Sequence, residues 1–64
     1  MPTIKVEWVE GRTLEQKRKL AAAITASMAE IAQTKPERVK VEFTDIPKTN
    51  LAWGGTLRVD EEVK

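Results

Sequence analysis

The chain has 64 residues, enough for one small domain that buries only about 60% of its unfolded surface, so its stability needs support from outside its own core. It contains no Cys and no His, which excludes disulfides, argues against a structural zinc site, and leaves oligomerisation as the remaining support. Its 11 Lys and Arg against 10 Asp and Glu give a net charge of +1, which offers no long-range field for nucleic acid or an anionic membrane.

Residues 3–9 alternate between apolar and polar side chains, with Ile4, Val6 and Trp8 on one face. This period of two predicts a strand. Pro2 precedes it, and a strand tolerates proline as its first residue because the missing N–H lies outside the hydrogen-bonded ladder. A second interpretation is chemical: if Met1 is removed, Pro2 carries a free secondary amine, which is a candidate base or nucleophile.

A helix is predicted to begin at about Leu14, because Thr13 and Gln16 form a T-x-x-Q capping box. Apolar residues then recur at spacings of four and three and form one stripe, with Ala23 and Ser27 beside it: Leu20, Ile24, Met28 and Ile31. The run 17–19 fans around the helix and predicts a solvated face. The helix should fade between Gln33 and Lys35.

Pro36 is predicted to start a short turn, and a second strand should follow from about Arg38 to Asp45, ended by Ile46 and Pro47. A strand, a crossover helix and another strand form a βαβ unit. We therefore expect an α/β fold whose two strands are parallel and whose crossover is right-handed.

The segment "KTNLAWGGTLRV" predicts a tight turn or short C-terminal hairpin, followed by a short strand at Thr56 to Val59. The charged tail 60–64 is expected to fray. No linker or repeat divides the chain, so we expect a single domain over residues 1–64.

A two-stranded sheet with one helix cannot cover both of its faces and both of its edges. We therefore expect symmetric assembly, in which two copies join edge to edge as a four-stranded sheet with two helices on one face. The other face remains for further association.

The residue types also narrow the chemistry. With no Cys, His or Tyr, and Ser27 as the only serine, the common nucleophiles and the common base at neutral pH are missing. Any catalysis must use an amine, a carboxylate or a cation, and we expect no metal and no cofactor. No apolar stretch approaches the roughly 20 residues of a membrane span or forms the apolar run of a signal peptide, so we expect a cytoplasmic protein without a membrane partner.

Four stretches together resemble the 4-oxalocrotonate tautomerase family, whose small βαβ subunits begin with Met-Pro: "MPTIKV", "EGRTLEQKRKL", "VKVEF" and "NLAWGG". The resemblance implies that Pro2, once exposed, is a general base that ketonises enols of 2-oxo acids such as 2-hydroxymuconate. It also implies a homohexamer built as a trimer of dimers. A secondary amine needs a depressed pKa to act at neutral pH, and one cation about 5 Å away supplies about two pKa units.

The resemblance places a substrate-binding arginine at Arg12. A strand from Pro2 to Val9 is about 23 Å long at about 3.3 Å per residue, so Pro2 and Arg12 cannot meet within one subunit. If two first strands pair antiparallel, the Pro2 end of one chain lies beside the Arg12 end of the other. We therefore expect an active site shared between chains.

Other positions depart from the family pattern. The family's second arginine falls on Lys40, and Arg38, two residues earlier on the same predicted strand face, is a partial substitute. The family's pocket aromatic aligns with Leu51, and Trp53 can supply an apolar wall instead. Trp53 also stands where related dehalogenases carry a water-activating Glu, so hydrolytic dehalogenation is not expected. These replacements keep an alternative open, a catalytically weak or silent subunit that completes a heterohexamer.

Overall fold

The computed structural model describes residues 1–61, and the two long strands and the long helix lie within residues 3–46. The elements in chain order are β1 (Thr3–Val9), α1 (Leu14–Ile31), the 3-10 turn η1 (Pro36–Arg38), β2 (Lys40–Ile46), the 3-10 turn η2 (Lys48–Asn50), β3 (Ala52–Trp53), β4 (Thr56–Leu57) and α2 (Arg58–Glu61).

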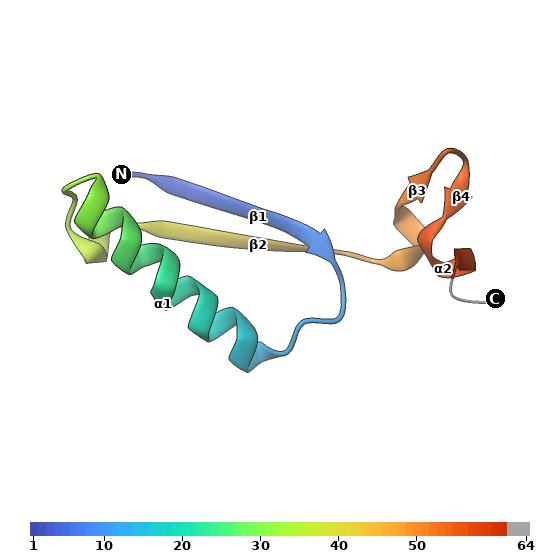
Figure 1. The fold of residues 1–64 in the computed structure, drawn as a ribbon, viewed down its shortest axis with the longest axis horizontal. Coiled ribbons are helices and arrows are strands. Elements are labelled where there is room, and N and C mark those ends of the chain that lie inside the picture. The colour runs from blue at the N-terminus through green and yellow to red at the C-terminus, as the bar shows by residue number, and fades with distance from the viewer. Residues whose placement is uncertain (62–64) are drawn as a thin grey trace.

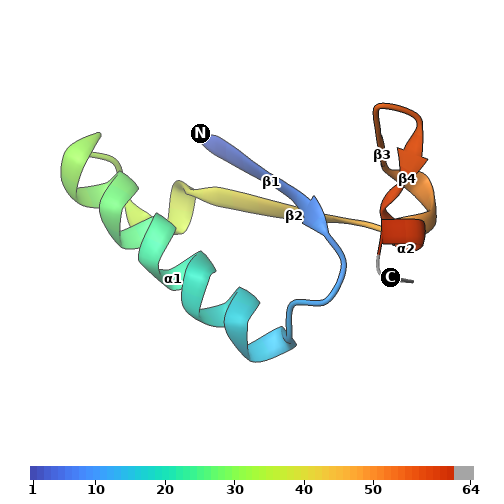
Figure 2. The ribbon, with the colours of Figure 1, turned by 45° about the vertical axis from the view of Figure 1, so that its right-hand side comes forward.

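β1 and β2 are parallel neighbours, paired from Thr3 with Lys40 to Val9 with Ile46. Helix α1 connects them and runs across one face of this two-stranded sheet (Figure 1; Figure 2). The predicted βαβ unit is therefore confirmed. β1 has the predicted bounds, and its even-numbered residues Ile4, Val6 and Trp8 are the more buried ones, as the alternation predicts.

The start of α1 is also confirmed. The Thr13 side chain accepts a hydrogen bond from the Gln16 amide at 3.1 Å, and the Gln16 side chain accepts one from the Thr13 amide at 2.8 Å. The helix ends at Ile31, earlier than the predicted fade at 33–35, because Gln33 adopts a left-handed conformation with φ 55°.

The partly buried face of α1 differs from the predicted stripe at its edges. Ile31 is 79% exposed, and Ala23 and Ser27 are exposed too. The residues that do face the sheet side are Lys17, Leu20, Ala21, Ile24, Thr25, Met28 and Ala29. The small residues that are partly buried therefore lie on the opposite flank of the stripe from the predicted pair.

The second strand begins later than predicted. Residues 36–38 form η1, in which the Arg38 amide bonds to the Lys35 carbonyl at 2.9 Å, so Arg38 is not a strand residue. β2 starts at Lys40 and includes Ile46, which was expected to end it.

A short antiparallel hairpin of β3 and β4 confirms the predicted turn. Gly54 and Gly55 both have positive φ, 56° and 87°, which glycine adopts without a Cβ clash. The strand predicted at Thr56 to Val59 is correct only to Leu57. Arg58 begins α2, which includes Asp60 and Glu61 of the tail expected to fray, and residues 62–64 lie outside the described part.

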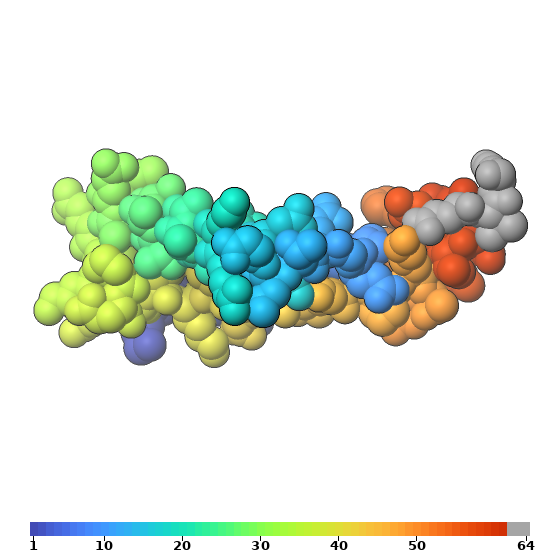
Figure 3. All heavy atoms as spheres, turned by 90° about the horizontal axis from the view of Figure 1, so that it is seen from below, coloured from blue at the N-terminus to red at the C-terminus, as the bar shows by residue number. Residues whose placement is uncertain are grey.

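The part of the isolated subunit that the structure describes has no buried core. None of residues 1–61 is buried, and the radius of gyration is 15.3 Å, where a compact chain of this length has about 11 Å. The hairpin region forms a separate lobe at one end of a molecule 46 Å long (Figure 3). Its accessible surface is 5044 Å², against about 4,100 Å² expected for a compact monomer of this mass. No helix among the described residues is both long and apolar enough to cross a membrane.

Candidate functional site

Pro2 and Lys40 lie together at the N-terminal end of the sheet, which is the end away from the hairpin (Figure 1). The Lys40 amide donates a hydrogen bond to the Pro2 carbonyl at 3.0 Å, which joins the backbone just before β1 to the first residue of β2. The Lys40 ammonium forms an ion pair with Glu42 at 3.4 Å, and both side chains are largely exposed. Pro2 is half-buried, while Met1 before it is 91% exposed.

Arg38 belongs to the same end of the sheet, but it does not share a strand face with Lys40 as predicted. It is the last residue of η1, and the extended Val39 separates it from β2. Proline at the first position of η1 sets this turn, so the guanidinium is carried by a 3-10 segment beside the strand start. Pro2, Lys40 and Arg38 therefore lie at the same end of the sheet within a single chain.

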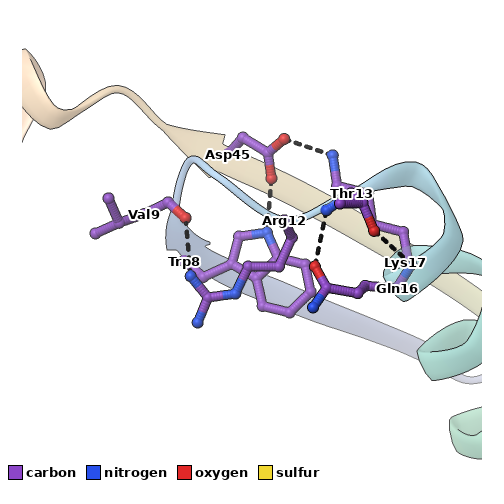
Figure 4. Close-up of polar contacts among 7 residues, drawn as sticks. All are labelled: Trp8, Val9, Arg12, Thr13, Gln16, Lys17 and Asp45. Carbon is purple, nitrogen blue, oxygen red and sulfur yellow. Dashed lines mark hydrogen bonds and ion pairs between the residues drawn. The ribbon is translucent and has the colours of Figure 1, made fainter.

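Arg12 lies at the opposite end of the sheet, after β1 has ended and just before the capped start of α1 (Figure 4). Its guanidinium carbon is 5.0 Å from the centroid of the Trp8 ring, a cation–π distance. Its Nη1 also donates a long hydrogen bond of 3.4 Å to the Val9 carbonyl. Gly11, with φ 128°, makes the turn that brings Arg12 back over the strand.

Three residues at the Arg12 end of the sheet were not predicted as site residues, and they are linked to one another: Trp8, Asp45 and Lys17. The Trp8 indole nitrogen donates to Asp45 Oδ1 at 2.6 Å, and Lys17 Nζ donates to Asp45 Oδ2 at 2.5 Å (Figure 4). Hydrogen bonds from Lys17 and then from Trp8 lower the pKa of the Asp45 carboxyl below its ordinary value. Lys17 is therefore not part of a solvated face. The signal that could have identified Trp8 and Asp45 as neighbours is the parallel pairing of the two strands, whose register places Trp8 opposite Asp45.

Leu51 and Trp53 lie beyond the end of β2, in the hairpin lobe. The Leu51 carbonyl accepts a hydrogen bond from the Arg58 amide at 2.8 Å, and Trp53 is 69% exposed. The lobe is joined to the Arg12 end of the sheet by the Lys48 amide, which donates to Glu10 Oε2 at 3.1 Å.

The six predicted site residues thus fall into two groups, one at each end of the β1–β2 sheet. Pro2, Lys40 and Arg38 are at the start of the strands, and Arg12, Leu51 and Trp53 are at or beyond their ends. No pocket is formed within residues 1–61, and no group of three or more Asp or Glu side chains in this range is arranged to hold a metal ion. Within one described chain, the two groups do not form a single site.

The sequence model of one family, described as tautomerase enzyme, matches residues 2–61. The chain is 38% identical to a probable tautomerase of Ralstonia nicotianae, over 95% of this chain and 94% of that protein. It is also 38% identical to the 2-hydroxymuconate tautomerase of a Pseudomonas species, over 86% of this chain and 87% of that protein.

Solved structures give the same result for the fold. A 4-oxalocrotonate tautomerase homologue superimposes with a TM-score of 0.89 at 32% identity, over 94% of this chain and 95% of that one. A heterohexamer 4-oxalocrotonate tautomerase from Chloroflexus aurantiacus superimposes with a TM-score of 0.83 at 28% identity, over 94% of this chain and 97% of that one.

Proposed function

The chain belongs to the tautomerase family and is an isomerase of that family, and we propose that Pro2, after removal of Met1, is its general base. The substrate is the enol of a 2-oxo acid, such as 2-hydroxymuconate. The amine takes the proton of the enol hydroxyl group and returns a proton to carbon, so that the ketone forms and the base is regenerated. The substrate is inferred from the similarity to the 2-hydroxymuconate tautomerase of the Pseudomonas species.

Cations near Pro2 have two tasks in this reaction. Lys40 and Arg38 are at the same end of the sheet as Pro2, where positive charge favours the unprotonated amine and stabilises negative charge that develops on the enol oxygen. Lys40 acts as a point charge, because an ammonium lacks the planar fork with which arginine holds a carboxylate.

The observation that carries the proposal is the separation of Arg12 from Pro2 in a subunit that buries none of its residues 1–61. Joining two copies through antiparallel β1 edges brings the Arg12 end of one chain to the Pro2 end of the other. The same contact covers an open strand edge, so assembly completes the site and supplies the missing burial. We propose a homohexamer, a trimer of such dimers, with Leu51 and Trp53 of the hairpin lobe lining the pocket of a neighbouring chain.

Two measurements test the role of Pro2. Intact mass shows whether Met1 is removed, and turnover of 2-hydroxymuconate and phenylenolpyruvate gives kcat and KM. Pro2→Ala is a partial test because it leaves a primary amine, so the decisive variant inserts one Gly between Met1 and Pro2 and converts the proline nitrogen to an amide. We expect kcat to fall about 10²- to 10⁴-fold, the usual contribution of a general base. Unchanged turnover by the insertion variant contradicts the proposal.

A second candidate is a silent subunit that lends Arg12 or Lys40 to a different partner chain. It is favoured by the similarity to a heterohexameric enzyme and by the pairing of Lys40 with Glu42. The purified chain would then be inactive alone and active only when mixed with a second tautomerase subunit. Robust turnover by the chain alone excludes this candidate.

A further inference from the structure

Arg12 has an unusual set of partners. Its guanidinium lies over the Trp8 ring and touches one backbone carbonyl, that of Val9. Among residues 1–61 it forms no ion pair with a carboxylate, although Asp45 is close enough for its pKa to be lowered by the Arg12 charge. A charged side chain held in place but not neutralised keeps its donors available for an anion from outside the subunit.

Each oxygen of the Asp45 carboxylate already accepts a short hydrogen bond from a residue other than Arg12. Oδ1 accepts from the Trp8 indole and Oδ2 accepts from Lys17. The carboxylate is therefore committed to a neutral donor and to a different cation. If Lys17 were absent, Arg12 would be the nearest alternative cation for Asp45.

The orientation of the Trp8 ring is fixed from two sides. Its edge is held by the hydrogen bond to Asp45, and one face stacks on Phe43 with centroids 5.4 Å apart and an interplanar angle of 21°. The Arg12 guanidinium lies over the ring at 5.0 Å. Two of these contacts join β1 to β2, so the position of the guanidinium follows the rigid strand pair rather than the loop that carries Arg12.

We propose that Trp8 and Asp45 are positioning residues that present Arg12 to the carboxylate of a substrate bound at a neighbouring subunit. The inference rests on the proposed function, because it needs Arg12 to bind substrate. Trp8 supplies the surface on which the guanidinium lies, and Asp45 fixes that surface while Lys17 keeps Asp45 from pairing with Arg12.

Kinetics of a dicarboxylate enol separate this role from packing. Trp8→Leu removes the aromatic face and should raise KM about 2- to 5-fold, the equivalent of an exposed cation–π contact, with kcat changed less than about twofold. Trp8→Phe keeps a face but loses the indole N–H and should lie between wild type and Trp8→Leu. Asp45→Leu should raise KM in the same way, and Asp45→Asn, which keeps an acceptor for the indole, should raise it less.

Lys17→Gln and Lys19→Gln form a matched pair on neighbouring helix positions. Lys17→Gln releases Asp45 to pair with Arg12 and should raise KM, whereas Lys19, whose side chain contacts neither Asp45 nor Arg12, should leave KM unchanged. If both variants raise KM equally, the effect is one of net charge and the inference is wrong.

Fluorinated tryptophan tests the contact without changing the shape of the side chain, and it remains usable if Trp8→Leu does not fold. In a Trp53→Phe background, only Trp8 is labelled, and each KM is compared with that of unlabelled Trp53→Phe protein because Trp53 is itself a proposed pocket residue. Each added ring fluorine weakens the negative potential of the ring face, so KM should rise stepwise from unlabelled to trifluorinated protein while the melting temperature changes little. A KM that is independent of fluorination overturns the inference.

Arg12→Ala distinguishes the two levels of the proposal. If Arg12→Ala raises KM strongly while all Trp8 and Asp45 variants match wild type, the positioning role is wrong and the proposed function stands. If Arg12→Ala itself matches wild type, both the role of Arg12 and its positioning are wrong.

Discussion

Replacement of Thr13 by Ala removes one half of the capping box that starts α1. The lost bond is the one from the Gln16 amide to the Thr13 hydroxyl, 3.1 Å in length, and the reciprocal bond from the Thr13 amide to the Gln16 side chain remains possible. Loss of an N-cap side chain costs about 1 kcal/mol, within a range of about 0.5–2. The same turn carries Lys17, so the change also loosens the contact with Asp45.

The cost converts to a measurable melting shift. For a domain of this size about 1 kcal/mol corresponds to about 4–8 °C in Tm, so Thr13→Ala should melt about 4–8 °C below wild type. Thr13→Ser keeps the acceptor and should stay close to wild type, and Thr13→Gly should lose only a few tenths of a kcal/mol. All variants need the same protein concentration, because assembly makes Tm concentration-dependent.

Circular dichroism at 222 nm follows the transition. If Thr13→Ala melts within about 1 °C of wild type, the capping box does not stabilise the helix as the hydrogen bonds indicate. If Thr13→Ser is as destabilised as Thr13→Ala, the loss has a cause other than the hydroxyl group.

Three further outcomes are expected. The pKa of Asp45 is lowered, so the pairing of its carboxylate stabilises the fold above the ordinary carboxyl pKa, and this stabilisation is lost as pH falls below about 4. Asp45→Asn should therefore flatten the acid side of a profile of Tm against pH. An unchanged acid slope contradicts the pairing of Asp45. Gly11→Ala places a side chain at φ 128° and should cost about 1–3 kcal/mol; a Tm equal to wild type would show that the turn relaxes freely. Trp53→Asp replaces a large exposed aromatic side chain with a charged one. The dissociation constant for self-association, measured by sedimentation velocity, should rise at least about 30-fold, which corresponds to the loss of an interface hot spot of about 2 kcal/mol. An unchanged dissociation constant places Trp53 outside the subunit contacts.

The sequence was sufficient to predict an element wherever one short stretch forms its own hydrogen bonds or alternates regularly between apolar and polar residues. The bounds of β1, the capped start of α1 and the glycine turn of the hairpin follow from residues within a few positions of one another. Pro2 as the general base stays a prediction, because its place after Met1 follows from the sequence but the cations that would keep its amine unprotonated are placed by the tertiary structure.

Tertiary structure decided what depends on residues far apart in sequence. Helix α1 ends at Ile31, two residues before the left-handed Gln33, and η1 places Arg38 before the start of β2. Both features depend on how the chain returns from the helix to the sheet. Asp45 is 37 residues from Trp8, and only the parallel register places their side chains together beneath Arg12. Sequence alone determined which charged and aromatic groups the chain contains. Tertiary packing determined that Asp45 pairs with Lys17 and that Arg12 lies over Trp8, because these contacts join residues that are far apart in sequence or meet only across a turn.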